Sequence, residues 1–458
     1  MKKSCFYFLI SFVAINIYAA PQKKAAPTSA VGAAAKICAD PLGEPADGWP
    51  EAPITILFHR EDSKAPWARN PAIKAPGLEA ASPASARTVA CVEESLEVTG
   101  KYDNGLSGYQ ASWRVTLIRA VDRKVFFIST SFDGEKPPAI MLRRGENIGT
   151  RPVESVVQWL RLIAEQKVAK FRMRLRSKSY EEVSAMAFST DNSKLVMAQE
   201  ARSTGSGTPP SPLTVFDISD GKILLTLVPN LFARHVDISK SGNMIAADGF
   251  KHVEVWDVAT GKVIHRLAAP EIQSLFFAPD DSLAVAGGGQ AVLWDVSKEN
   301  KLRSAAGSYM TLSPGGTWLV AKQEARGITV QELESGHAVA TFPPVSSNAT
   351  WAITNDGKAL GRFSVLGSAS MYVAGDAQSH SLALPYIDLR AVSGLAPTRD
   401  GFVVADRDGV IGIASAANPE PRAFATDQIG VRSVAISTDG KLIAVGDMSG
   451  SATIWELR

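Results

Sequence analysis

Residues 431–446 read VRSVAISTDGKLIAVG, which is an apolar strand, a polar turn and a second apolar strand. The turn at Thr438-Asp439-Gly440 has residue types suited to a tight reversal, because Asp accepts local backbone bonds and Gly tolerates a positive φ. The flanking runs have the length and the β-branched content of strands. This stretch predicts an antiparallel hairpin, and it decides the fold because the chain repeats it.

The same order of strand, turn and strand recurs at a period of roughly 40 residues, the length of one four-stranded propeller blade. Six further turns precede the one at 438–440, and they are Thr190-Asp191, Lys240-Ser241-Gly242, Asp280-Asp281, Pro314-Gly315-Gly316, Asn355-Asp356-Gly357 and Arg399-Asp400-Gly401. Third strands follow in five copies, namely LTVFD at 213–217, VEVWD at 253–257, AVLWD at 291–295, ITVQE at 328–332 and ATIWE at 452–456. The repeat predicts a mainly β fold, a seven-bladed β-propeller over residues 167–458.

At these residues the chain resembles the WD40-repeat family. The Trp-Asp signature is complete at Trp256-Asp257 and at Trp294-Asp295, and Phe216-Asp217 and Trp455-Glu456 are near matches. The Gly-His pair that members carry before the first strand is absent, so the hydrogen-bond tetrad associated with that His is not carried over. The resemblance implies a divergent bacterial WD40-like propeller that serves as an interaction scaffold, and a propeller of another sequence family is the alternative.

The last copy stops after its third strand at Arg458, so a closed ring needs a fourth strand from elsewhere. Residues 170–176 are the candidate, because Phe171, Met173 and Leu175 alternate with basic residues. We expect this segment to pair with residues 453–457 as the outermost strand. The basic side chains suggest a weak contact with an anionic partner, or else charges that discourage pairing at a sheet edge. They are Lys170, Arg172, Arg174 and Arg176.

Residues 38–166, ahead of the repeat, predict a small α+β domain with a Pro/Ala-rich loop at 64–87. Alternation over 109–118 indicates a half-buried strand, and the turn at 122–124 leads into a second strand. Pro152 opens a segment whose apolar residues fall on one helical face, which predicts a helix ending near Gln166. Residues 20–37 are expected to form a low-complexity leader.

The chain begins with the order of a secretory signal peptide, assigned to residues 1–19. Lys2 and Lys3 precede an uncharged apolar run at 5–18 and then small residues. A retained anchor is the alternative, although the run is shorter than the roughly 20 residues that span a bilayer. We expect an exported protein, periplasmic rather than extracellular, with no transmembrane segment in the mature chain. Its two remaining cysteines, Cys38 and Cys91, are expected to form a disulfide.

Composition excludes several classes of protein. Lys and Arg number 48 against 46 Asp and Glu, so the global charge of +2 does not favour nucleic-acid binding. The six histidines lack metal-ligand spacing, and the Gly-rich turns lack a Gly-Lys-Ser/Thr ending, so neither a metal nor a cofactor is expected. No Gly-x-Ser-x-Gly motif occurs, and we assign no catalytic residue.

In a propeller, the loops entering each blade and those between its second and third strands meet on one face. Tyr and Arg, which are enriched at interface hot spots, occur in these loops. We therefore expect a non-enzymatic scaffold that binds another envelope or secreted protein of unknown identity. The alternative for each residue is ordinary loop packing, and the alternative function is an envelope-polymer hydrolase or lyase that uses residues of the central channel. The predicted protein-binding residues are Tyr180, Phe232, Arg234, Tyr309, Arg326, Tyr386, Arg390, Arg407 and Arg432.

Overall fold

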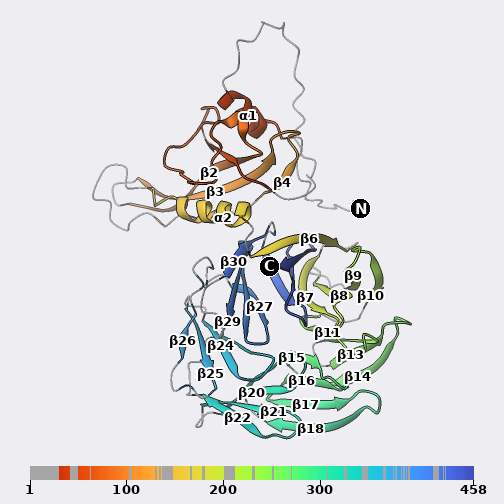
Figure 1. Cartoon of the computed structure of the whole chain (residues 1–458). Helices are drawn as coiled ribbons and strands as arrows, with labels where there is room; N and C mark the ends of the chain where they lie inside the picture. The colour runs from red at the N-terminus through yellow and green to blue at the C-terminus, as the bar shows by residue number, and fades with distance from the viewer. Residues whose placement is uncertain are drawn as a thin grey trace, which may run out of the picture.

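The computed structural model has two parts, an N-terminal region built on one curled sheet and a ring of seven sheets (Figure 1). The residues that the structure describes are 30–41, 50–61, 63–102, 106–128, 132–133, 136, 148–165, 168–177, 181–200, 212–228, 233–249, 252–269, 271–306, 308–323, 327–342, 349–364, 368–374, 376, 379–382, 384, 387, 389, 392–415, 422–426, 428 and 430–458. The expected signal peptide lies outside them.

The N-terminal sheet has the strand order β1-β2-β3-β4, and β5 pairs with β3. Strand β1 runs parallel to β2, whereas β2 and β3 form a long antiparallel hairpin. The strands are β1 (Ile54–Arg60), β2 (Thr88–Lys101), β3 (Ser107–Arg119), β4 (Val125–Ile128) and β5 (Phe132–Asp133), and the helices are α1 (Ala30–Ala39), the 3₁₀ turn η1 (Pro83–Ser85) and α2 (Val153–Glu165).

Three expectations for this region are confirmed, and one segment differs. Strands β3 and β4 form the expected hairpin, and α2 begins directly after Pro152. The expected disulfide joins Cys38 to Cys91. Helix α1, however, occupies most of the second half of the stretch expected to be a low-complexity leader, because its Ala-rich sequence has high helix propensity and packs Ala34 and Cys38 against the sheet.

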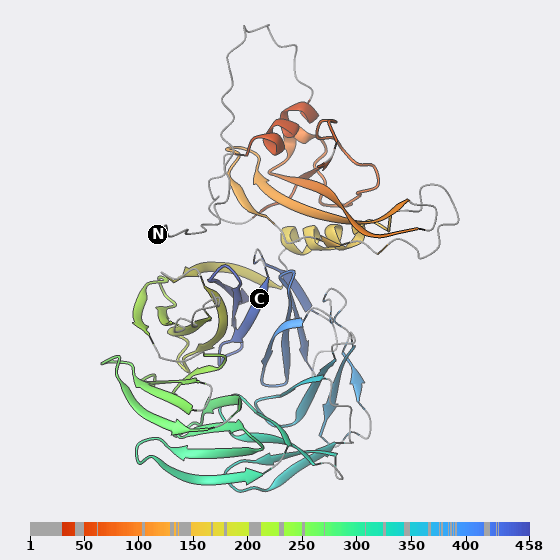
Figure 2. The ribbon, with the colours of Figure 1, turned by 180° about the vertical axis from the view of Figure 1, so that it is seen from behind.

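The predicted mainly β fold is confirmed, because seven four-stranded antiparallel sheets follow, as propeller blades do (Figures 1 and 2). We number the blades by their innermost strands in chain order. Blade 1 consists of β7 (Glu182–Phe188), β8 (Lys194–Glu200), β9 (Leu213–Asp217) and β10 (Ile223–Leu227). Blade 2 consists of β11 (Val236–Ile238), β12 (Met244–Asp248), β13 (His252–Asp257) and β14 (Val263–Ala268). Blade 3 consists of β15 (Ile272–Phe277), β16 (Leu283–Gly287), β17 (Gln290–Asp295) and β18 (Asn300–Ala306).

The remaining four blades have the same up-and-down order. Blade 4 consists of β19 (Ser308–Leu312), β20 (Trp318–Gln323), β21 (Gly327–Glu332) and β22 (Ala338–Phe342). Blade 5 consists of β23 (Ala349–Ile353), β24 (Ala359–Ser364), β25 (Ser368–Val373) and β26 (His380–Ser381). Blade 6 consists of β27 (Val392–Pro397), β28 (Gly401–Asp406), β29 (Val410–Ser415) and β30 (Arg422–Ala425). Blade 7 is β31 (Val431–Ile436), β32 (Leu442–Asp447), β33 (Ser451–Leu457) and β6 (Ala169–Arg176).

Strand β6 closes the ring, in the pairing that its alternation of apolar and basic residues predicts. It lies antiparallel to β33, with Phe171 opposite Trp455 and Leu175 opposite Ala452. Leu175 is buried among residues of blades 7 and 1, while Arg172 is exposed. The first and last strands of the repeat therefore share one sheet.

Helix α2 lies between the N-terminal sheet and the propeller (Figure 1). Its buried Val156, Leu160 and Ile163 belong to an apolar cluster that extends into blade 6, where Ala425 of β30 is a member. The boundary that the sequence suggests at 166–167 lies outside the described residues and stays a prediction. Because α2 contacts both parts, the two share a packed interface.

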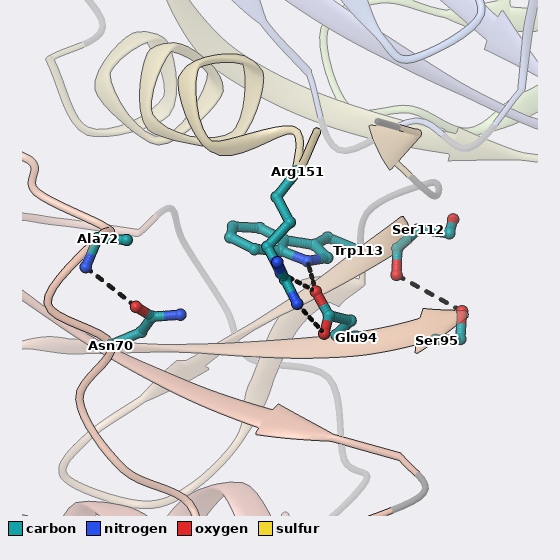
Figure 3. Close-up of polar contacts among 7 residues, drawn as sticks. All are labelled: Asn70, Ala72, Glu94, Ser95, Ser112, Trp113 and Arg151. Carbon is teal, nitrogen blue, oxygen red and sulfur yellow. Dashed lines mark hydrogen bonds and ion pairs between the residues drawn. The ribbon is translucent and has the colours of Figure 1, made fainter. Parts of the chain in front are cut away.

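A buried carboxylate fixes the start of α2 (Figure 3). Glu94, on β2, is 1% exposed and accepts a bond from Trp113 Nε1 at 2.8 Å. Arg151, just before the helix, donates to the same carboxylate through Nε at 2.7 Å and Nη2 at 3.3 Å. This buried carboxylate is therefore both paired and hydrogen-bonded, which is what makes burial of a charge tolerable.

Candidate protein-interaction face

One face of the ring is built where innermost strands begin and second strands end. The antiparallel order of each sheet brings these two kinds of chain segment together. A backbone bond from Val431 N to Arg407 O, 3.3 Å, links the start of blade 7 to the turn after the second strand of blade 6. We call this side the entry face.

Five innermost strands have a one-residue register shift close to the entry face, and in β19 it falls between Ser308 and Thr311. In the other four strands the extra residue is a single bulged position. The extra residue is Ser184 in β7, Gln273 in β15, Ser393 in β27 and Arg432 in β31. A bulge re-aims a side chain out of the regular alternation of a strand. The bulges therefore place mostly polar residues at repeated positions around the entry face, of which Gln273 and Arg432 are exposed and the hydroxyl of Ser393 is buried.

Three of the predicted arginines are joined in one arc across blades 6, 7, 1 and 2. The carbonyl of Arg407 accepts the bond from the amide of Val431, which is the residue before Arg432. Arg432 Nε lies 3.2 Å from Glu182 Oε2 of blade 1. Ser184 Oγ, on the same strand as Glu182, donates to the carbonyl of Ala233, the residue before Arg234, at 2.7 Å. We call Arg407, Arg432 and Arg234 the arginine arc.

Buried aspartates at the ends of second strands hold this face in shape. Asp248 accepts bonds from the backbone amides of Arg234 and His235, both at 2.7 Å, and lies 2.8 Å from His235 Nδ1. Asp406 accepts bonds from the amides of Asp408 and Val410. These carboxylates fix the backbone beside two members of the arginine arc.

Asp447 plays the same part in blade 7. It accepts bonds from the amides of Ser449 and Ser451. Burial raises the pKa of its carboxyl, and the hydrogen bonds and Arg174 act in the opposite direction. Sequence reasoning missed these three aspartates, although each ends the second apolar run of its copy, and Asp406 and Asp447 are each followed by a Gly three positions later.

The side chains of the other six predicted residues are not described by the structure. Tyr309 lies in β19, with its side chain outside the described residues. Five more lie wholly outside them, and these are Tyr180, Phe232, Arg326, Tyr386 and Arg390. Their role on the entry face stays a prediction.

One carboxyl on an innermost strand has a strongly altered acidity. Burial raises the pKa of Asp237, on β11, to about 7, and bonds from the amides of Phe277 and Ile238 oppose that shift. Its Oδ2 accepts the bond from Phe277 N of blade 3 at 2.7 Å. Asp237 thus joins two blades. Within the described part of the chain, no group of three or more His, Cys, Asp or Glu residues is arranged to hold a metal ion.

Comparison with known proteins identifies one repeat. The family model described as WD domain, G-beta repeat matches residues 424–456, which include β31, β32 and most of β33. No curated protein matches the chain. The chain thus contains a WD40 repeat and seven four-stranded sheets consistent with a WD40-like propeller, and such repeats generally suggest a protein-interaction scaffold. Among the described residues, no helix is long and apolar enough to cross a membrane.

Proposed function

We propose that this protein is an exported, periplasmic scaffold whose entry face binds another envelope or secreted protein. The observation that carries the proposal is the arginine arc, since blades 6, 7 and 2 each place one arginine on the entry face, beside backbone that buried carboxylates fix. Arginine is enriched at interface hot spots, and a rigid backbone lowers the entropy lost on binding.

Export is supported by the Cys38–Cys91 disulfide and by the N-terminal order of basic, apolar and small residues. Disulfides persist in oxidising compartments. Fractionation of the producing cells, followed by mass analysis of the mature N-terminus, tests this part of the proposal. A chain that keeps Met1 and stays in the cytoplasm would contradict it.

The binding role is tested by photo-crosslinking from the entry face. A photoreactive amino acid at Arg432 should capture one specific partner from intact cells. Lys441 is the matched control, because it lies in blade 7 in the turn at the opposite end of the strands and its side chain is 73% exposed. Equal capture from both positions, or none from Arg432, would argue against an entry-face partner.

Charge reversal supplies a second test. Arg432→Glu places like charges beside Glu182 and should weaken partner capture from Arg234, whereas Lys441→Glu should not change it. Purified variants must keep the urea midpoint of the parent protein, so that a loss of capture reports on binding.

A further inference from the structure

The outer wall of the ring has a repeated feature on its outermost strands, β10, β14, β18, β22 and β6 (Figure 1). Each of these strands has a one-residue bulge against the third strand of its blade. The bulge lies beside the position of the Trp-Asp signature. In blades 5 and 6, which lack that signature, the described pairing of the third and fourth strands ends before this position.

The extra residue at this bulge is aliphatic and exposed in four consecutive blades. Leu224, Ile264, Leu302 and Val339 occupy it in blades 1 to 4, and between 40% and 52% of each residue is exposed. In blade 7 the extra residue is Arg172. We call the four aliphatic residues the rim residues.

This placement is not a random scatter of surface hydrophobics. Within the described chain, nine large hydrophobic residues are exposed, and six lie on or next to the outermost strands of blades 1 to 4. Bulges protect sheet edges from pairing, but charged residues serve that purpose better than aliphatic ones. The repeated use of Leu, Ile and Val therefore calls for a partner that covers them.

The rim residues lie on a continuous wall. The turn before β14 packs on β10, because a Cβ added to Gly261 would lie 3.4 Å from atoms of both Leu225 and Leu227. His265 Nδ1 of β14 lies 2.5 Å from Glu299 Oε1 in the turn before β18. Over blades 1 to 3, the turn before an outermost strand thus contacts the outermost strand of the preceding blade.

The charged residues on the outermost strands of this wall are all basic. The seven outermost strands contain eight Lys or Arg residues and no Asp or Glu, although acidic residues number 29 against 28 basic ones over 167–458. Three of the eight, Arg266, Lys301 and Arg303, lie in blades 1 to 4, and four lie on β6 of the adjoining blade 7. Arg266 is paired with the buried Glu254 at 2.8 Å, and Lys301 lies over the Trp294 ring. The acidic residues nearby lie in the turns at one end of these strands, where Asp257 and Asp295 accept bonds from hydroxyl groups and Glu299 pairs with His265.

We propose that the rim binds an acidic, extended segment of a partner polypeptide whose aliphatic side chains pack on the rim residues. Charge complementarity with the outermost strands selects an acidic partner. A polypeptide fits better than a membrane, because the rim residues follow a curved wall from blade to blade, whereas a flat bilayer would reach one or two blades. This surface is distinct from the entry face and does not depend on the function proposed for it.

The test is fluorescence anisotropy of the full-length protein with three labelled peptides, repeats of Glu-Ser-Leu, Glu-Ser-Ser and Lys-Ser-Leu. The Glu-Ser-Leu peptide should bind, and it should bind more weakly as salt rises. The triple variant Leu224→Ser, Ile264→Ser, Leu302→Ser should weaken binding at least about tenfold, since aliphatic burial is lost at three blades. Val121→Ser is the control, because Val121 is 87% exposed and lies outside the rim.

Arg303→Glu gives an independent variant that leaves the rim residues in place, and it should also weaken the Glu-Ser-Leu complex. Circular dichroism and the urea midpoint show that each variant is folded. The proposal is overturned if the Glu-Ser-Leu peptide does not bind, if the triple variant binds it as the parent does, or if phosphatidylglycerol vesicles bind while the peptide does not. Arg432→Glu should leave peptide binding unchanged, which separates this result from the fate of the entry face.

Discussion

Leu175 tests how the ring is closed, because its side chain joins the first and last strands of the repeat. It is 1% exposed and packs with Phe216 of blade 1 and Ile454 of blade 7. It also lies under the turn of blade 1, where a Cβ added to Gly221 would come within 3.3 Å of its Cδ2. Leu175→Ala should cost about 2 to 5 kcal/mol of unfolding free energy, because a fully buried Leu leaves a cavity that rigid strands cannot collapse.

The equivalent residue of blade 1 supplies the control. Leu227 is 4% exposed and holds the same place in β10, opposite Leu213, that Leu175 holds opposite Ala452. Leu227→Ala should cost a similar free energy. Only Leu175→Ala, however, should free β6 from blade 7 and uncover the edge of β33, because β6 reaches that sheet from the far end of the repeat.

Urea denaturation measures the free energy, and hydrogen exchange at the amides of residues 451–457 measures the detachment of β6. Exchange there should accelerate in Leu175→Ala and not in Leu227→Ala. Arg172→Gln, at an exposed position of β6, should change the free energy by less than about 0.5 kcal/mol. A cost below about 1 kcal/mol for Leu175→Ala, or equal exchange in the two Leu variants, would refute closure by this strand.

Three further variants test the buried polar groups and the disulfide. Asp237→Asn keeps an acceptor for Phe277 N and removes a charge that burial disfavours, so it should be more stable than the parent by about 2 to 4 kcal/mol at pH 8. Because the raised pKa is about 7, urea titrations should show this difference growing between pH 4 and pH 7 and levelling off above; a constant difference would contradict it. Arg151→Gln leaves the buried Glu94 without its ion-pair partner and should lower the free energy of unfolding by about 3 to 5 kcal/mol. Glu94→Gln should cost less, because the Arg151 that it leaves unpaired is 40% exposed and can be hydrated. Thermal melts showing the reverse order would contradict this prediction. Replacing Cys38 and Cys91 by Ser opens a loop with a sequence separation of 53 and should lower the free energy of unfolding by roughly 4 kcal/mol. In thermal melts, a reductant should destabilise the parent protein but not this variant; a variant that melts at the same temperature as the parent would contradict the prediction.

The propeller could be predicted from sequence because its information is local and repeated. Each copy carries its own strand, turn and strand, and the closing strand is recognisable from the alternation of Phe171, Met173 and Leu175 with basic residues. Strand β1 was missed for the opposite reason. It pairs in parallel with β2 across a Pro/Ala-rich stretch, and neither strand indicates the other in the sequence.

The entry face was predicted only in outline. Topology places the loops on one side, but the ties between the members of the arginine arc depend on residues far apart in the chain, such as Arg432 with Glu182. Glu94 and Arg151 are likewise 57 positions apart, and a lone Glu within a strand pattern has no distinguishing feature. Side-chain pairs of this kind become visible only when the sheets are assembled.

The bulges connect the two proposals physically. Near the start of an innermost strand, a bulge brings a residue such as Arg432 to the entry face, and beside the signature position a bulge brings Leu224 or Leu302 to the outer wall. A regular strand has two faces, and in the inner strands of a blade both are covered by neighbouring blades, so a side chain there reaches solvent where the strand is irregular. On the outermost strands, regular positions such as Arg266 are exposed as well. The repeat therefore produces binding positions at the same places where it departs from regular pairing, and substitutions there should alter binding while leaving the blade cores intact.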